Sequence, residues 1–296
     1  MIRRNLFFHR LGLFAWVALG LVLLATLLYV SQEPSLPRSG STWQGYTLGG
    51  LSLVIMAWLA SLGIRKRRYS ASGTLQAWVS AHVYLGLALV GIVTLHSAGQ
   101  LGWNVHGAAY IFMLIVVISG IAGTWMYIVL PRWATENRKG LSREEMLREL
   151  SDIDSECTEV SSHCSAATEL AIRSSLQGTR LGGSLWDQLL GIDKSTYSGS
   201  KDASNTEHTQ LLSNTDQSRI LQFMADLLPN AEDPQEANAL SEAISLVARR
   251  QELLRRIRRD IQIQSWLKFW LLVHVPMTFG LLGAIAVHIT VVFIYW

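Results

Sequence analysis

Four histidines lie within long apolar stretches of the sequence, and their spacing is the same in both stretches. His82 and His96 are 14 residues apart, as are His274 and His288. In an α-helix, 14 residues complete nearly four turns, so both rings of a pair leave one helix face, about 21 Å apart along the axis. Two such helices side by side offer imidazoles to each other at two depths. Two stacked haems need this arrangement if one histidine from each helix holds each iron.

Ionisable side chains are costly in a bilayer interior, so four histidines in two apolar stretches need a common explanation. A single histidine in a membrane span can hydrogen-bond a neighbouring helix or line a proton path, and both alternatives stay open for each residue alone. The repeated spacing favours ligation of metal porphyrins. Zinc or copper is disfavoured, because the two depths are too far apart for one ion and neither provides a carboxylate or thiolate.

The segments that carry these histidines are long and poor in charge. Of 296 residues, 50% are hydrophobic and 16% are charged, which is typical of a membrane protein. Five segments are long enough to span a bilayer, at residues 11–30, 48–64, 75–98, 105–130 and 267–296. We expect an all-α integral membrane protein with five transmembrane helices, in which spans two to five form a haem-binding four-helix bundle. The first span has the basic start of a signal peptide, but its long apolar run favours a retained, peripheral anchor.

Charge divides the chain into three parts. Residues 131–264 hold 21 of the 22 acidic residues but 16 of the 25 Lys and Arg, and the rest of the chain is strongly basic. The sequence therefore predicts membrane spans over residues 1–130, a soluble insert over 131–264, and a final span over 265–296 that completes the bundle. Because the remaining cations flank membrane spans, we expect membrane lipid and no nucleic acid as a partner.

The cations also orient the spans. Basic clusters precede the first span, follow the second and fourth, and precede the fifth. The positive-inside rule then places the N-terminus and the insert in the cytoplasm and the C-terminus outside, as expected for a bacterial inner-membrane protein. The third and fifth spans run in the same direction. His82 is therefore expected to pair with His274 at an inner haem, and His96 with His288 at an outer haem.

Glycines occur at matching depths in the second and fourth spans. Gly49 and Gly63 are 14 residues apart, and Gly107 and Gly120 are 13 apart. A porphyrin between helices needs a close backbone approach, which glycine permits because it has no Cβ. We expect Gly49 and Gly107 beside the outer haem and Gly63 and Gly120 beside the inner haem. Ordinary packing of small residues between membrane helices explains the same pattern.

Other residues near the spans allow several roles. His106 opens the fourth span at the outer depth, where it can serve a quinone site, hydrogen-bond a haem propionate, replace a ligand, or simply lie at the membrane surface. The cations of residues 65–68 can orient the chain or bind haem carboxylates. Four tryptophans are expected to anchor their helices at the inner interface, namely Trp78, Trp133, Trp266 and Trp270.

The insert has the pattern of an antiparallel helical hairpin. Ser142 and Glu145 match a capping box, and an apolar stripe from Met146 to Ala171 follows in steps of four and three. A second stripe over residues 240–261 leads into the final span. Residues 178–218 are rich in Gly, Ser, Thr and Asp, which predicts a flexible, partly disordered tip.

Cys157 and Cys164 are the only cysteines in the sequence, and both fall on the first stripe. Two thiols are too few for an iron–sulfur cluster, and seven residues along one helix are too far apart for a disulfide. Packing is therefore their expected role. The insert has no Gly-rich phosphate loop, so we expect a docking arm for a cytoplasmic redox partner.

These histidine and glycine spacings resemble those of the membrane di-haem cytochrome b family, the b-haem subunits of quinol-oxidising and quinone-reducing respiratory complexes. The resemblance covers spans two to five. It implies two bis-histidine haem b groups and electron transfer with quinones or redox subunits. The family's Pro-Glu-Trp-Tyr type of quinol-site motif is absent here, and the large insert and the leading span are additions to the family's pattern.

The expected function is transmembrane electron transfer between a quinone or periplasmic carrier and a partner protein, as a subunit of a membrane oxidoreductase complex. One alternative is a haem-free scaffold or assembly protein whose histidines make interhelical hydrogen bonds. Another is a transporter with a histidine proton relay, which is disfavoured because the spans contain no Asp or Glu.

Overall fold

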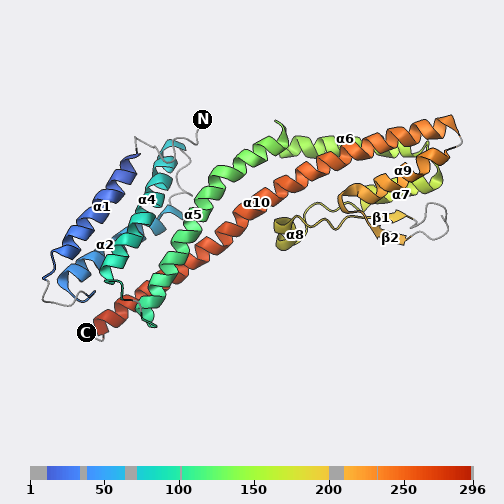
Figure 1. The fold of residues 1–296 in the computed structure, drawn as a ribbon. Coiled ribbons are helices and arrows are strands. Elements are labelled where there is room, and N and C mark those ends of the chain that lie inside the picture. The colour runs from blue at the N-terminus through green and yellow to red at the C-terminus, as the bar shows by residue number, and fades with distance from the viewer. Residues whose placement is uncertain are drawn as a thin grey trace. The chain divides into compact units, whose positions relative to one another are not determined.

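The computed structural model divides the chain into two compact units (Figure 1). Unit 1 comprises Met1–Ile128 and Phe269–Trp296, and unit 2 comprises Val129–Lys268. The structure describes residues 12–33, 39–63, 72–100, 102–199, 210–231 and 233–294. The basic N-terminal leader and the cations of residues 65–68 therefore lie outside the described residues.

Unit 1 is built from apolar helices around one core. Its described helical segments are α1 (Leu13–Val30), α2 (Trp43–Ala60), α4 (Ser72–His96), the first part of α5 (Val105–Arg138) and the last part of α10 (Pro234–Ile294). Each segment contributes to the core, whose buried side chains include Ala25, Leu48, Ile92, Met113 and Leu281. α1 packs mainly on α4, where Val22 lies beside Gly91.

Several helices are apolar enough to cross a membrane. Within the described residues there are four by length and composition: α1, α4, the helix that begins at Val105, and α10. Large side chains such as Leu27 (68% exposed) and Phe279 (69%) point outward, as expected where helices face lipid. α2 has 18 residues and begins with polar groups, including Gln44 and Thr47, and it does not reach the same apolarity. The second span, predicted over residues 48–64, and with it the count of five spans, therefore remains a prediction.

Unit 2 combines helices with a small β-hairpin. Between the ends of α5 and α10 lie α6 (Arg143–Ser161), α7 (Ala166–Gln177), α8 (Leu185–Leu190), β1 (Thr196–Gly199), β2 (Gln210–Ser213), η2 (Thr215–Gln217), α9 (Ser218–Leu227) and η3 (Leu228–Asn230). The predicted capping box of Ser142 and Glu145 is confirmed at the start of α6. The predicted stripe on α10 is also confirmed, because Leu240, Val247 and Leu254 are buried in the core of this unit.

The prediction of one continuous helix from Met146 to Ala171 is wrong. α6 ends at Ser161, and α7 begins only at Ala166. The hydroxyls of Ser161 and Ser162 donate to carbonyls three residues earlier, Thr158 O at 2.8 Å and Glu159 O at 2.7 Å. Such local hydrogen bonds compete with helix propagation. Cys157 therefore lies on α6, whereas Cys164 lies in the turn that follows.

The segment predicted as a flexible tip, residues 178–218, contains regular structure. β1 and β2 pair antiparallel, with Tyr197 opposite Leu212, and the two side chains are 3% and 8% exposed. Both belong to the core of unit 2. Burial of this apolar pair stabilises a hairpin that the polar composition of the segment does not indicate. Residues 200–209 lie outside the described residues.

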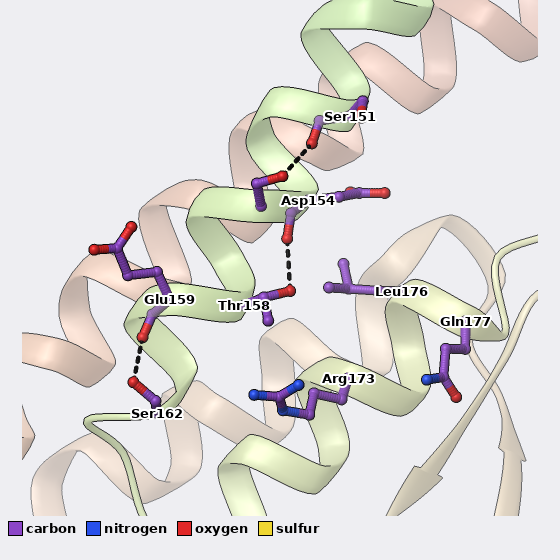
Figure 2. Close-up of a pocket in the computed structure, with 9 residues that line it drawn as sticks. Ser151, Asp154, Thr158, Glu159, Ser162, Arg173, Leu176 and Gln177 are labelled. Carbon is purple, nitrogen blue, oxygen red and sulfur yellow. Dashed lines mark hydrogen bonds between the residues drawn. The ribbon is translucent and has the colours of Figure 1, made fainter.

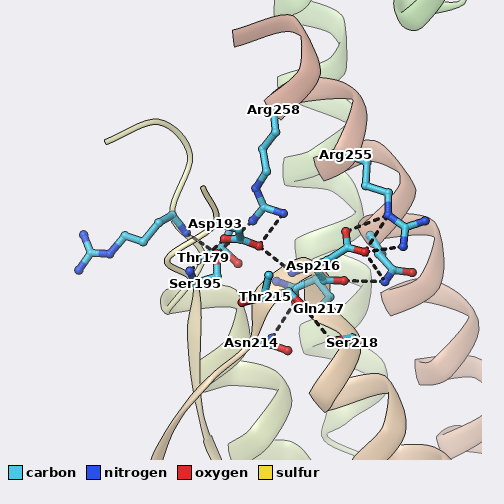
Figure 3. A network of polar contacts seen from close by, with 12 residues as sticks. Thr179, Asp193, Ser195, Asn214, Thr215, Asp216, Gln217, Ser218, Arg255 and Arg258 are labelled. Atoms are coloured by element: carbon cyan, nitrogen blue, oxygen red, sulfur yellow. Dashed lines mark hydrogen bonds and ion pairs between the residues drawn. The ribbon is translucent and has the colours of Figure 1, made fainter. Parts of the chain in front are cut away.

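A network of polar contacts holds η2 against α10 (Figure 3). Arg255 pairs with Asp216, and Arg258 pairs with Asp193 at 2.9 Å. Asp216 and Gln217 have positive φ angles of 54° and 57°, a conformation that costs energy in residues other than glycine. Gln251 Nε2 donates to the Asp216 carbonyl at 2.5 Å, so ion pairs and hydrogen bonds from α10 offset this cost.

Asp260 gives a test of how unit 2 is held together. Its side chain is fully buried and pairs with Arg138 of α5 at 2.6 Å and with Arg143 at the start of α6 at 2.8 Å. We predict that Asp260→Asn lowers the free energy of unfolding by about 2 kcal/mol, less than a fully buried pair would lose because both guanidiniums are partly exposed. Urea-dependent pulse proteolysis of the full chain in detergent measures the loss.

The matched control is Glu252→Gln, which removes the i,i+4 partner of Arg256 from a pair whose Glu252 side chain is 51% exposed. We expect it to cost less than about 0.5 kcal/mol. Equal effects of the two substitutions would contradict a structural role for the Asp260 contacts.

Candidate functional site

Three of the histidines meet near one end of unit 1. His96 comes from the last turn of α4, His106 from the first turn of α5, and His288 from α10. The ring centroids of His96 and His288 are 6.2 Å apart, with the ring planes at 86°. His106 contacts His288 directly, with its Nδ1 2.5 Å from His288 Nδ1. The structure thus brings together the two residues predicted as the outer pair and places His106 directly against one of them.

The backbone of α2 positions the His96 ring. His96 Nδ1 lies 2.8 Å from the carbonyl oxygen of Gly45. One turn further along α2, a Cβ built on Gly49 would lie 2.9 Å from His96 Cε1, which is closer than real contacts allow. The ring can pack this closely only because Gly49 has no side chain. The predicted proximity of Gly49 to the outer pair is confirmed.

At the other depth, a serine and a tryptophan surround His274. Its Nδ1 lies 2.7 Å from the hydroxyl of Ser119 on α5. The Trp270 ring lies over His274 at a centroid distance of 5.4 Å, and Trp270 Nε1 donates to the Ser119 carbonyl at 2.8 Å. A Cβ on Gly120 would lie 3.5 Å from His274 Cε1, so the predicted proximity of Gly120 to the inner pair is confirmed.

His82 of α4 lies close enough to His274 for the two rings to interact electrostatically, and its ring also meets the Leu59 carbonyl. Its Nδ1 is buried, with no hydrogen-bond partner among the described residues. A buried polar nitrogen of this kind calls for an explanation, because most such atoms in folded proteins have a partner. The structure thus brings the residues of the predicted inner pair near each other.

Three of the four histidines have a common pattern at their ring nitrogens, which His82 does not share. In His96, His274 and His288, the nitrogen that contacts a protein group is Nδ1. A histidine that binds a metal through Nε2 engages its Nδ1 in this way, with a carbonyl or another polar group that fixes the ring. A nitrogen about 2 Å from a metal puts its ring centroid about 3.2 Å away, so two opposed imidazoles on one metal have centroids about 6.3 Å apart. The 6.2 Å between His96 and His288 fits this spacing.

Two of the predicted glycines have other surroundings. A Cβ on Gly107 would lie 2.0 Å from the carbonyl oxygen of Gly102, so this glycine serves the turn that leads into α5. Within the described part of the chain, no heavy atom comes within 4 Å of a Cβ on Gly63. Neither finding places these two glycines beside a histidine ring among the described residues, so their positions beside the haems remain a prediction.

Two of the predicted interfacial tryptophans pack against other helices. Trp270 lies against Gly123, where a Cβ would come within 1.9 Å of the indole, and Trp78 stacks on Trp58 at 4.4 Å. Two groups that contact the histidine rings, Ser119 and the Gly45 carbonyl, were not predicted from the sequence. Ser119 had a usable signal, because it is the one hydroxyl residue in the apolar stretch 111–122. The Gly45 carbonyl had none, since backbone groups carry no sequence signature.

An open groove in unit 2 does not form a comparable site (Figure 2). It runs between α6 and α7 and is lined mainly by hydroxyl and charged side chains. The hydroxyl of Thr158 donates to the Asp154 carbonyl at 2.8 Å, and Ser162 likewise bonds its own helix. Arg173 pairs with Glu169. These polar groups are therefore satisfied locally and do not converge on a common point.

The described residues of the two units form no site for a free metal ion. Within the described ranges, no group of three or more His, Cys, Asp or Glu side chains could hold a metal ion. This finding does not bear on axial ligation, which takes two histidines per porphyrin. Comparisons of the chain with protein-family models, with curated proteins and with solved structures give no significant match.

The cysteines differ in environment, and this difference can be measured. Cys157 is fully buried in the core of unit 2, and burial raises the pKa of its thiol to about 11. Cys164 is partly exposed, and burial raises the pKa of its thiol by less. The thiolate is the reactive form, and at pH 8 it amounts to about one thousandth of a thiol with a pKa near 11.

We predict that iodoacetamide at pH 8 modifies Cys164 at least about tenfold faster than Cys157, because reaction requires an accessible thiolate. Peptide mass spectrometry of the full chain follows both sites. Raising the pH toward 11 should accelerate the reaction of Cys157, as its thiol deprotonates. In denaturant the two rates should converge, and equal rates in the folded chain would contradict the buried position of Cys157.

Proposed function

We propose that the chain is a di-haem b-type cytochrome subunit that relays electrons across a membrane. The observation that carries the proposal is the proximity of His96 and His288, because a centroid separation of 6.2 Å suits two histidines that would together hold one haem iron. The Nδ1 contacts of His96 and His274 support it, since they leave Nε2 as the ligating nitrogen. The family resemblance in histidine spacing points the same way.

In this proposal, His82 and His274 hold an inner haem b, and His96 and His288 hold an outer one. Bound haem supplies a one-electron iron couple, and two histidine ligands leave no open coordination position, so the role is relay and not oxygen chemistry. The chain's own groups fix the ligands. The Gly45 carbonyl and the Ser119 hydroxyl orient the rings, and Gly49 and Gly120 provide close backbone approach.

The proposed setting is a bacterial inner membrane, with unit 2 in the cytoplasm. Electrons pass between a quinone or periplasmic carrier on one side and a redox partner subunit that docks on residues 131–264 on the other. His106 belongs to the outer site in this proposal, because it supports His288 through the contact between their Nδ1 atoms.

A second candidate is a haem-free scaffold or assembly protein. The histidine contacts also favour this candidate if their role is to join helices. The contacts of His274 with Ser119 and of His106 with His288 connect α10 to α5 without a cofactor. A reduced-minus-oxidised spectrum of the purified full chain separates the two functions. Two b-type haems per chain support the relay, and a chain that purifies and reconstitutes with no haem supports the scaffold.

Single histidine substitutions test the pairing. We predict that His288→Leu and His82→Leu each remove one of the two haems, because each breaks one pair and leaves the other intact. Pyridine haemochrome titration per chain and low-temperature difference spectra measure the loss. The control is His163→Leu, since His163 is exposed in the turn between α6 and α7. Loss of both haems, or of neither, in His288→Leu would contradict the pairing.

Two adjacent glycines offer a more demanding test. Gly49→Ala places a methyl group 2.9 Å from His96 Cε1, whereas within the described chain no heavy atom lies within 4 Å of a Cβ on Gly50. We predict that Gly49→Ala shifts or removes the low-spin electron paramagnetic resonance signal of the outer haem, and that Gly50→Ala leaves both signals in place. An equal response to the two substitutions would mean that His96 is not held against α2 as an axial ligand.

A further inference from the structure

One end of unit 2 exposes large apolar side chains. α8 and its flanking residues present Leu181 (37% exposed), Trp186 (63%), Leu190 (66%) and Ile192 (45%). Trp186 and Leu190 are four residues apart and share a face of α8. The other side of α8 is used for packing, since Asp187 and Leu189 are 7% and 2% exposed and Gln188 between them accepts a hydrogen bond from Ser265 of α10. The segment is therefore amphipathic, with its apolar side turned away from its own unit.

The position of α8 along α10 is fixed by hydrogen bonds. Ser265 Oγ donates to Gln188 Oε1 at 2.7 Å, and Gln262 Nε2 donates to the Leu189 carbonyl at 3.0 Å. The long apolar run of α10 begins at Leu267, only about 3 Å further along the helix axis than Ser265. α8 thus packs on the last turn of α10 before the helix becomes fully apolar.

Contacts between α5 and α10 show that α5 also becomes apolar near the position of α8. Arg138 pairs with Asp260 at 2.6 Å, and Asn137 donates to the Arg256 carbonyl, so α5 and α10 are antiparallel neighbours here. On α5, Trp133 lies five residues from Arg138, toward the apolar segment. On α10, Ser265 lies five residues from Asp260, also toward the apolar segment. Each step is about 7.5 Å along its helix axis, so Trp133 and Ser265 lie at the same level. Trp133 is 42% exposed. Exposed tryptophans on α5 and α8 therefore lie close to where both long helices become apolar.

This end of the unit also carries cations. The exposed basic residues near α8 and near the starts of the apolar segments are Arg132, Arg180, Arg259 and Lys268, together with Lys194, which pairs with Asp187 of α8. Aromatic and aliphatic side chains rimmed by Lys and Arg are the composition of segments that lie in the headgroup layer of a bilayer. Anionic phospholipid complements these cations.

We propose that α8, with Leu181 and Ile192 on either side, lies in the surface of the phospholipid bilayer that α10 enters, and that it fastens unit 2 to that surface. The occupant of the apolar face is lipid, because α10 continues from the α8 contact directly into its apolar run. The proposal rests on membrane insertion of α10 and is independent of whether the chain binds haem.

Depth-dependent quenching tests the proposal on the full chain. Leu190→Cys is made with Cys157→Ala and Cys164→Ala, labelled with the fluorophore NBD, and reconstituted in vesicles of phosphatidylcholine and phosphatidylglycerol. The matched control is Leu211→Cys in the same background, because Leu211 is 73% exposed on β2, remote from α8 in the chain. The probe is lipid with a nitroxide near the headgroup end of its acyl chain.

We expect the nitroxide lipid to remove about half of the emission at position 190 and little at position 211, since interfacial segments lie at the boundary between headgroups and acyl chains. If the Leu190→Cys chain fails to fold, Ile192→Cys provides a second reporter. Weak and equal quenching at positions 190 and 211 overturns the proposal. Protection from aqueous iodide without lipid quenching also overturns it, and assigns the face to a second copy of the chain.

Discussion

The need to satisfy imidazole nitrogens in apolar surroundings is the constraint on which unit 1 depends. A polar nitrogen that leaves water without finding a partner costs free energy, and inside a helix bundle the partners must come from neighbouring helices. His96 is met by a carbonyl of α2 and His274 by a hydroxyl of α5. These contacts require short distances between helices, which explains why Gly49 and Gly120 stand where the rings approach.

In unit 2 the buried polar groups that need partners are ionised side chains. Arg250 is 1% exposed and pairs with Asp154 at 2.6 Å, and Asp260 is buried between two guanidiniums. Buried charges of this kind contribute to specificity only when each is fully paired. The polar network around Asp216 also depends on partners from α10, because groups on α10 hold two residues that have an unfavourable backbone conformation. One helix therefore supplies charged partners to unit 2 and histidines to unit 1.

Much of the fold could be predicted from the sequence where a periodic pattern had a single physical cause. The apolar stripe on α10 and the capping box at Ser142 follow from helix geometry, and the histidine spacing placed His96 near His288, although the closest ring contact, between His106 and His288, was not predicted. Failures came where a tertiary contact overrides local composition. Burial of Tyr197 against Leu212 creates a hairpin in a Ser- and Gly-rich segment, and backbone-directed serine hydroxyls interrupt a stripe that looked continuous. For Gly63 and Gly107 the spacing predicts a depth only, and no histidine ring is among the described atoms nearest to a Cβ built on either glycine.

The continuity of α10 has a consequence for biogenesis. This helix of 61 residues is about 92 Å long. It contributes Leu254 to the core of unit 2 and Leu281 to the core of unit 1, yet every other described helix precedes it in the chain. During synthesis, neither core can close before α10 leaves the ribosome. Until then His82 and His96 lack the neighbouring side chains that α10 provides, so a site built from both helices forms only after α10 has been synthesised.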